Sequence, residues 1–303
     1  MKRSMLALAL VVALAAACGD QSSTPAATGG ATPTVPAGSG STAAAAPQRI
    51  VSLSSTATET LFAIGAGPQV IAVDDQSNYP AQAPKTDLSG YTPNIEAIAA
   101  KKPDLVVIST DTDGLKAKLE ALKITVVRQD AAKTLDAAYA QITELGKVTG
   151  RDKEAAATVA AMKASIEASK KKVSKPAVPV KVYHELDNTL YSVSSKSFVG
   201  EMYTVLGLTN IADAADKDGT GYPQLSAEYL IAQNPDFVFL ADTKCCGQNA
   251  KTVAARPGWA ELRAVKLGNV IELDDDIASR WGPRVVELVK SISDALALVE
   301  AGK

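Results

Sequence analysis

The sequence is poor in the residues that build metal centres. His184 is the only histidine, and neither a second histidine nor clustered carboxylates accompany it at ligand spacing, which argues against a site for bare zinc or manganese. To serve as a ligand, His184 would have to point outward from a strand end. A histidine satisfied by a backbone carbonyl is the more common case. The run Asp274-Asp275-Asp276 could bind a hard cation, although acidic runs in loops are usually solvated.

Motifs of common enzymes are also missing. The sequence has no Gly-x-Ser-x-Gly elbow, no phosphate-binding loop and no cysteine near the histidine in sequence. We therefore expect a protein that is not an enzyme. Cys245 and His184 could still meet in the folded chain, so a thiol-dependent exported enzyme is a less favoured alternative. The formal net charge of −2 gives no indication of a nucleic-acid partner.

The body of the chain lacks long hydrophobic runs. No uninterrupted apolar stretch after the N-terminus reaches about 18 residues, the length that indicates a transmembrane helix. The 303 residues, 47% hydrophobic and 21% charged, are typical of a soluble protein with two domains.

The N-terminus has the pattern of an export signal. Lys2 and Arg3 precede the apolar stretch Met5–Ala17, and small residues lead to Cys18. This pattern resembles a bacterial lipobox, although Ala15 stands where a leucine is usual. We expect a lipoprotein signal peptide at 1–18, lipidation of Cys18 and anchoring to the outer face of the cytoplasmic membrane. Simple secretion with cleavage nearby, giving a periplasmic protein, is the alternative. Residues 19–48, rich in Ala, Thr, Ser, Pro and Gly, predict a disordered tether.

Two cysteines remain once Cys18 is set aside. Cys245 and Cys246 are adjacent, and an exported protein occupies an oxidising compartment. They are candidates for a vicinal disulfide, and free thiols or a soft-metal site are the alternatives.

One uninterrupted helix is predicted over residues 151–175. The stretch has no Gly or Pro and is rich in Ala. Val159, Met162, Ile166 and Val173 recur at helical spacing, and Pro176 ends the pattern. At 1.5 Å per residue this helix would span roughly 35 Å.

Matching segments lie on either side of this helix. Residues 94–108 and 226–240 each carry a Glu (Glu96 and Glu228), a Pro-Asp pair seven residues later and an apolar run. Residues 59–65 likewise resemble 201–207. Strands alternate with helices in both halves, which predicts an α/β fold of two similar lobes, 49–150 and 176–303. Each lobe would be a mostly parallel sheet flanked by helices, and the helix would join them.

As a set, these features over residues 48–300 resemble the helical-backbone (class III) substrate-binding lipoproteins of bacterial ABC importers, in the branch that captures ferric siderophores, haem or cobalamin. The resemblance implies a monomer that needs no cofactor and binds a metal chelate in a cleft between strand ends. A cell-surface haem binder of the same fold is an alternative. The segment 276–284 resembles the cobalamin binder's stretch, but Gly90 and Ser109 stand where that protein has aromatic residues, which argues against cobalamin and leaves ferric chelates open. The implied ligand-binding residues are Ser54, Ser55, Tyr79, Tyr91, Thr110, His184, Tyr191, Tyr222, Lys244, Asp276 and Arg280.

The resemblance also implies a role for the matched glutamates. Glu96 and Glu228 would sit on the exposed tips of the two lobes and dock into basic pockets of the ABC permease dimer, which works with ATPase subunits. Solvated helix acids without a partner are the alternative.

Overall fold

The computed structural model describes residues 45–173 and 178–301. Two four-stranded sheets, all of whose pairings are parallel, organise these residues. The first has the order β2-β1-β3-β4, with β1 Ile50–Leu53, β2 Val70–Val73, β3 Leu105–Ile108 and β4 Thr125–Arg128. The second has the order β6-β5-β7-β8, with β5 Lys181–Glu185, β6 Thr209–Asn210, β7 Phe237–Leu240 and β8 Val270–Glu272. The two orders are equivalent, so β1 corresponds to β5 and β3 to β7.

Helices cover both faces of each sheet. In the N-terminal lobe they are α1 Ser55–Ala63, α2 Ile95–Ala100, α3 Leu115–Ala121 and α4 Leu135–Thr149, with 3-10 turns η1 Gly67–Gln69 and η2 Thr112–Gly114. In the C-terminal lobe they are α6 Phe198–Val205, α7 Ala227–Gln233, α8 Thr243–Cys246, α9 Ala250–Ala254, α10 Arg263–Lys266, α11 Asp275–Ala278 and α12 Val285–Ala301, with turns η3 Ile211–Ala214 and η4 Trp259–Glu261. The predicted α/β fold of two similar lobes is confirmed.

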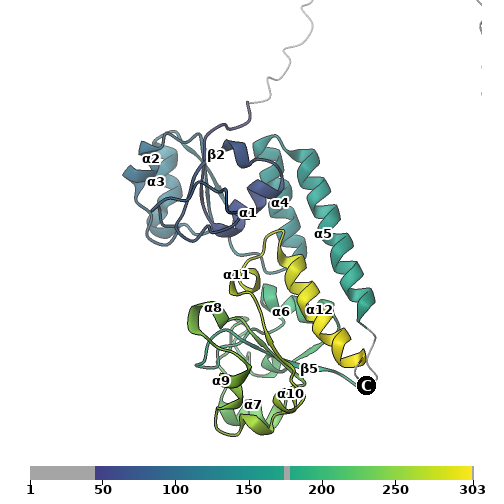
Figure 1. The fold of residues 1–303 in the computed structure, drawn as a ribbon. Coiled ribbons are helices and arrows are strands. Elements are labelled where there is room, and N and C mark those ends of the chain that lie inside the picture. Colours follow the sequence, from purple (N-terminus) through teal and green to yellow (C-terminus); the bar gives the residue numbers. More distant parts are fainter. Residues whose placement is uncertain (1–44, 174–177, 302–303) are drawn as a thin grey trace, which may run out of the picture. The chain divides into compact units, whose positions relative to one another are not determined.

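The long helix α5, Asp152–Lys172, runs between the two sheets in the chain. Met162 and Ile166 of the predicted stripe are buried, and Val159 and Val173 pack partly buried against the same cluster. Residues 174 and 175, the end of the predicted range, lie outside the described residues. Figure 1 shows α5 beside α4 and α12, which pack against it.

A single hydrophobic cluster crosses both lobes. It contains residues of α1 and α4 as well as residues of α6 and α12, such as Leu61, Ile142, Met202 and Val289. Separate clusters fill the other face of each sheet, one around Val106 and one around Tyr183. Burying apolar surface contributes roughly 25 cal/mol per Å², so a shared core opposes separation of the lobes.

Two parts of the C-terminal lobe depart from a simple alternation of strands and helices. Tyr191 lies outside the sheet and forms only an isolated bridge with Gln224. The last helix, α12, begins at Val285, after residues 280–284, which bind side chains of the first lobe. Strand β6 was not anticipated, and its two residues are too few to give a period-2 pattern.

Candidate functional site

A polar cavity of about 230 Å³ opens at the carboxyl ends of β1, β2 and β3. Ligands of open α/β sheets commonly bind at this edge. Segment 276–281, which follows β8 of the other sheet, closes one side. The lining residues are Leu53, Ser54, Ser55, Thr56, Asp74, Gln76, Gly90, Tyr91, Ser109, Thr110, Asp276, Ser279, Arg280 and Trp281.

A buried chain of hydroxyl groups fixes the floor of this cavity. The Thr58 hydroxyl lies 2.9 Å from that of Ser52 and 2.8 Å from that of Ser77, and the Ser77 hydroxyl donates to Asp74 Oδ1 at 2.5 Å. Burial raises the pKa of Asp74. Gly90 closes the floor, since a Cβ there would lie 2.6 Å from the Leu53 carbonyl oxygen and 3.0 Å from Asp74 Oδ2. The small residue at position 90 is therefore required by close approach of the backbone.

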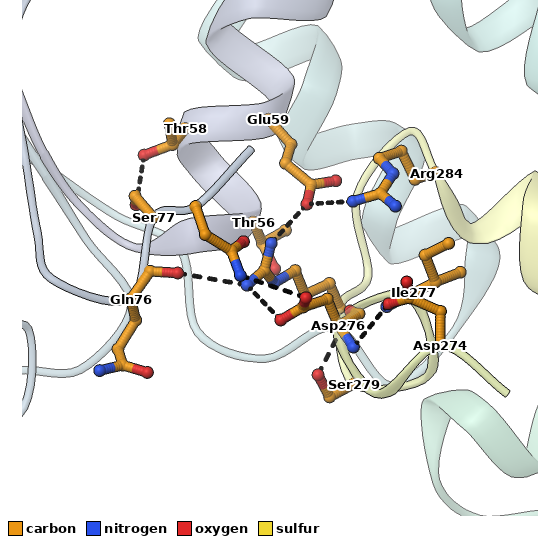
Figure 2. A network of polar contacts seen from close by, with 12 residues as sticks. Thr56, Thr58, Glu59, Gln76, Ser77, Asp274, Asp276, Ile277, Ser279 and Arg284 are labelled. Carbon is orange, nitrogen blue, oxygen red and sulfur yellow. Dashed lines mark hydrogen bonds and ion pairs between the residues drawn. The ribbon is translucent and has the colours of Figure 1, made fainter. Parts of the chain in front are cut away.

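Arg280 forms the charged wall of the cavity and joins the two lobes. Its guanidinium donates to Glu59 Oε1 at 2.7 Å, to Asp276 Oδ1 at 2.9 Å and to the Gln76 carbonyl oxygen at 3.2 Å. Glu59, on α1, also accepts from Arg284 at 3.2 Å, and Figure 2 shows this carboxylate pointing toward Arg284. Burial raises the pKa of Glu59, although both arginines oppose the shift. Arg280 is only 8% exposed, so it is held in place by the protein itself.

The structure brings together part of the predicted ligand-binding set. The residues that line the cavity are Ser54, Ser55, Tyr91, Thr110, Asp276 and Arg280. Tyr79 lies beside it, under the Arg284 guanidinium at 4.1 Å from the ring centroid. Lys244 donates to Asp274 at 2.6 Å and to Asp276 at 3.0 Å, outside the cavity. Tyr191 and Tyr222 are exposed residues of the second lobe and are not among the lining residues.

His184 does not face the cavity. It is 0% exposed, its Nδ1 lies 2.7 Å from the Tyr203 hydroxyl, and its Nε2 has no partner among the described residues. Burial lowers the pKa of His184 to about 3, so the ring is neutral. As the next-to-last residue of β5 it faces the core, and its expected place in the ligand-binding set is wrong. The alternative of a Cys245–His184 thiol site finds no support, since the ring is buried and both cysteines are exposed.

Sequence reasoning missed several residues of the site, among them Asp74, Gln76, Trp281 and Glu59. Only Glu59 had a signal, as one half of the repeat that pairs it with Glu201. Both glutamates make contacts between lobes, because Glu201 on α6 accepts from the backbone N–H of Leu135 on α4 at 2.7 Å. The repeat therefore marks two equivalent connections between the lobes.

The equivalent edge of the second sheet is closed by charged residues. Glu185, at the end of β5, is 0% exposed and accepts two 2.6 Å hydrogen bonds from Arg256. The Arg256 guanidinium lies over the Trp259 ring, 4.5 Å from its centroid. Asp242, after β7, is 0% exposed, and neither of its carboxylate oxygens has a partner among the described residues. Burial and the nearby Glu185 raise the pKa of Asp242 to about 7. The structure joins Cys245 and Cys246 in a disulfide just beyond it.

Glu96 and Glu228 occupy matching places in the two lobes. Each is the second residue of its helix, α2 or α7, each follows a capping residue (Asn94 or Ser226), and both are exposed. Cys18 and residues 19–44 lie outside the described residues. Within 45–173 and 178–301, no group of three or more His, Cys, Asp or Glu residues is placed to hold a metal ion. No helix in these ranges is long and apolar enough to cross a membrane.

Known proteins share this sequence pattern and architecture. Residues 50–277 match the family described as periplasmic binding protein. The chain belongs to this family. An ABC transporter substrate-binding lipoprotein of Bacillus subtilis is 32% identical over 82% of this chain and 80% of that protein. A cobalamin-binding protein of Halobacterium salinarum is 30% identical over 82% of this chain and 69% of that protein.

Solved structures agree with the family. A possible iron-binding (periplasmic solute-binding) protein of Staphylococcus epidermidis has a TM-score of 0.71 and 26% identity, and covers 82% of this chain and 98% of that one. The periplasmic vitamin B12-binding protein of Vibrio cholerae has a TM-score of 0.66 and 24% identity, over 84% of this chain and 98% of that one, and shows the fold alone. The predicted family and fold are confirmed, and this chain is a periplasmic binding protein of the ABC-transporter type.

Proposed function

We propose that this protein captures a metal chelate, cobalamin or a ferric siderophore, at the cavity between the first sheet and segment 276–281, and delivers it to an ABC permease. The observation that carries the proposal is the position of Arg280. It lines the cavity and is held by partners from both lobes, Glu59 and Asp276. A fixed guanidinium suits the carboxylate, phosphate or hydroxamate oxygens of such ligands.

The size of the cavity limits how a chelate can bind. A volume of about 230 Å³ is below the roughly 300–1,000 Å³ of sites that enclose a whole ligand. A peripheral polar group of the chelate therefore enters the cavity, beside the hydroxyls of Ser55 and Thr110, and the remainder lies against exposed residues at the mouth. Tyr91, 75% exposed, offers an aromatic face there.

Two features favour different chelates. The relatives named as cobalamin binders favour cobalamin. The small residues Gly90 and Ser109 leave a polar lining without aromatic walls at these positions, which favours a ferric siderophore rich in oxygen atoms. Haem is the alternative, and the exposed Tyr91 hydroxyl is the group at this cavity that could approach its iron.

Calorimetric titration with cyanocobalamin, a ferric hydroxamate siderophore and haemin tests the proposal. We expect one of the first two to bind with micromolar or tighter affinity. Ser109→Arg, which fills the cavity with a long side chain, should weaken that binding at least about tenfold, the equivalent of 1.4 kcal/mol.

Thr125→Arg is the matched control. It introduces the same charge at the amino end of β4, the opposite edge of the same sheet, and should leave affinity unchanged. Equal effects of the two substitutions, or no binding of any chelate, would reject the site.

The exposed glutamates support a docking role. Glu96 and Glu228 would each engage a basic pocket on one half of a permease dimer, and the shared core between the lobes would fix their separation. Glu96→Lys with Glu228→Lys should leave chelate affinity unchanged and abolish uptake, because like charges at an interface cost several kcal/mol. Glu154→Lys with Glu167→Lys, exposed acids on α5, is the charge-matched control and should transport normally. Normal uptake by the Glu96/Glu228 variant would remove the docking role.

Anchoring by a lipid on Cys18 at the outer face of the cytoplasmic membrane completes the proposal. The mature protein should partition into the detergent phase, and the Cys18→Ala variant should not. A mature chain whose first residue is not Cys18 would contradict the lipid anchor.

A further inference from the structure

An exposed disulfide lies close to the segment that closes the cavity. Cys245 and Cys246 are consecutive residues at the end of α8, and both are exposed. The helix α8 has only four residues, too few for a helix to be stable without outside contacts. Its order therefore depends on the groups that hold it.

One carboxylate provides most of that support. Asp275 Oδ2 accepts from the backbone N–H groups of Lys244 and Cys245, both at 2.9 Å, and Oδ1 accepts from the N–H of Thr243 at 3.0 Å. The Thr243 hydroxyl adds a bond of 2.8 Å to Oδ1. Asp275 thus binds three consecutive amides, including that of a disulfide cysteine.

The same acidic segment reaches the cavity. Lys244 Nζ donates to Asp274 and Asp276, and Asp276 accepts from Arg280 at 2.9 Å and from Asn78 of the first lobe at 3.1 Å. Burial alone would raise the pKa of Asp276, but Lys244 and Arg280 outweigh this effect and hold the pKa below its usual value. A continuous set of contacts therefore runs from the disulfide, through Lys244 and the aspartates, to the charged wall of the cavity.

We propose that Cys245–Cys246 is a thiol-exchange site, and that its reduction by an external dithiol loosens the segment 274–280 and lowers affinity at the cavity. The part that concerns affinity rests on the proposed function. The exchange and the loosening do not, because both involve only contacts within this chain.

The chemical step is ordinary disulfide exchange. A thiolate of the dithiol attacks one sulfur of the pair, the bond between the two Sγ atoms breaks, and the other sulfur leaves as a thiolate that takes up a proton. The second thiol of the reagent then displaces the bound cysteine from the mixed disulfide. Two electrons and two protons pass to the cysteines, and the dithiol is oxidised to its own disulfide.

Reduction loosens the segment because it removes a covalent ring from a very short helix. Closure between consecutive cysteines restricts ψ of Cys245 and φ of Cys246, the backbone that directly follows the two amides bound by Asp275. When the ring opens, more backbone conformations become accessible, and ordering these residues costs more conformational entropy. Asp275 then loses donors and Asp276 loses Lys244, while Arg280 retains Glu59.

Hydrogen exchange of the full chain, before and after treatment with dithiothreitol, tests the proposal without any ligand. Peptide mapping after alkylation should show both thiols labelled under native conditions. Amides of 243–247 and 274–280 should then exchange about tenfold faster, the factor that corresponds to the net free energy of one hydrogen bond. Amides of β1 and β3 should not change.

The variant Cys245→Ser/Cys246→Ser is the control. It should exchange like the reduced protein and show no response to dithiothreitol. Two results would overturn the proposal: a pair that dithiothreitol does not reduce in the native protein, or a reduced protein in which exchange of 274–280 is unchanged. The wild-type comparison alone decides this if the variant does not fold.

Calorimetric titration of the oxidised and reduced proteins measures the functional consequence. The chelate that binds in calorimetry should bind the reduced protein about three- to tenfold more weakly, by loss of up to one hydrogen bond at the wall. Equal affinity of the oxidised and reduced forms would overturn this part. If neither cyanocobalamin nor the ferric hydroxamate binds either form, the proposed function fails, while the hydrogen-exchange result still decides the exchange site.

Discussion

The carboxyl ends of the two sheets have equivalent topology and opposite chemistry. After β1 and β3 the first lobe carries neutral hydroxyls, Ser54, Ser55, Ser109 and Thr110, around an open cavity. At the equivalent edge the second lobe has Glu185, which matches Leu53 in register, and Asp242, which matches Thr110, and both are 0% exposed. Buried charges must be paired or protonated, whereas hydroxyls can be left to a ligand at modest cost.

This difference shows how similar lobes can divide their roles. The first lobe leaves its strand ends free to bind. The second lobe uses Glu185 to hold Arg256, and Asp275, after β8, to hold α8. Substitutions at equivalent places should therefore affect stability in one lobe and binding in the other.

The largest effect is expected for Glu185→Ala. Removal of this carboxylate leaves the half-buried Arg256 without its two 2.6 Å hydrogen bonds. Breaking a buried pair by removing one partner typically costs about 3–5 kcal/mol of unfolding free energy. Urea denaturation measures the change. Ser109→Ala, at the equivalent edge of the first sheet, should stay within about 0.5 kcal/mol, and a similar loss in both variants would break the comparison.

Arg280→Ala should reduce affinity for the bound chelate by about 1.5–3 kcal/mol, the value of hydrogen bonds to charged groups. It should also lower stability, because the buried Glu59 keeps only Arg284 among its two arginine partners. Arg280→Lys keeps the charge but not the planar fork and should recover only part of the affinity. Calorimetry measures binding and thermal unfolding measures stability. A dissociation constant equal to that of the wild type would contradict the assignment.

Asp242→Asn should remove a pH dependence of stability. The pKa of Asp242 is raised to about 7 in the folded protein, whereas an unfolded aspartate titrates near 3.9. Between these values the folded state holds a proton that the unfolded state has lost, so stability falls as pH rises from about 4 to 7. The asparagine variant should match the wild type near pH 4 and be more stable by about 4 kcal/mol at pH 8, because about three pKa units separate the folded and unfolded carboxyl and each is worth about 1.4 kcal/mol. Denaturation at the two pH values measures this, and parallel pH profiles would refute it.

The smallest expected effect concerns the relation between the lobes. The shared hydrophobic cluster and the contacts of Glu59 and Glu201 across the lobes should keep them fixed. Solution scattering with and without the bound chelate should give the same radius of gyration within error. Marked compaction on binding would show that the lobes move.

Much of the fold could be predicted from sequence because local patterns determined it. The stripe in α5 and the two Pro-Asp segments gave the joining helix and the central strands of both lobes. The Gly-Pro pair at 282–283 is a local signal that α12 begins only after it, at Val285. The two-residue strand β6 and the short helices α8 to α11 depend on tertiary contacts and had no periodic signal.

The site was less predictable because its residues come from distant segments. Arg280 was expected to face the ligand, but its pairing with Glu59, 221 positions away, has no local pattern. His184 illustrates the opposite error. Its place near a strand end suggested the cavity, but at that end the side chain faces the core, and the direction of one side chain depends on strand register.

The account's central claim is that ligand binds at the first lobe's strand ends and not at those of the second. The two tryptophans are suited to test it, because Trp281 lines the cavity with its Nε1 donating to Gln141 at 2.9 Å, and Trp259 is buried in the second lobe. Nitrogen–proton correlation spectra would show one indole resonance for each, recorded during titration with cyanocobalamin or a diamagnetic gallium-loaded hydroxamate siderophore. The Trp281 resonance should shift on binding while that of Trp259 stays in place. A shift of Trp259 alone would place the ligand in the second lobe and contradict the account.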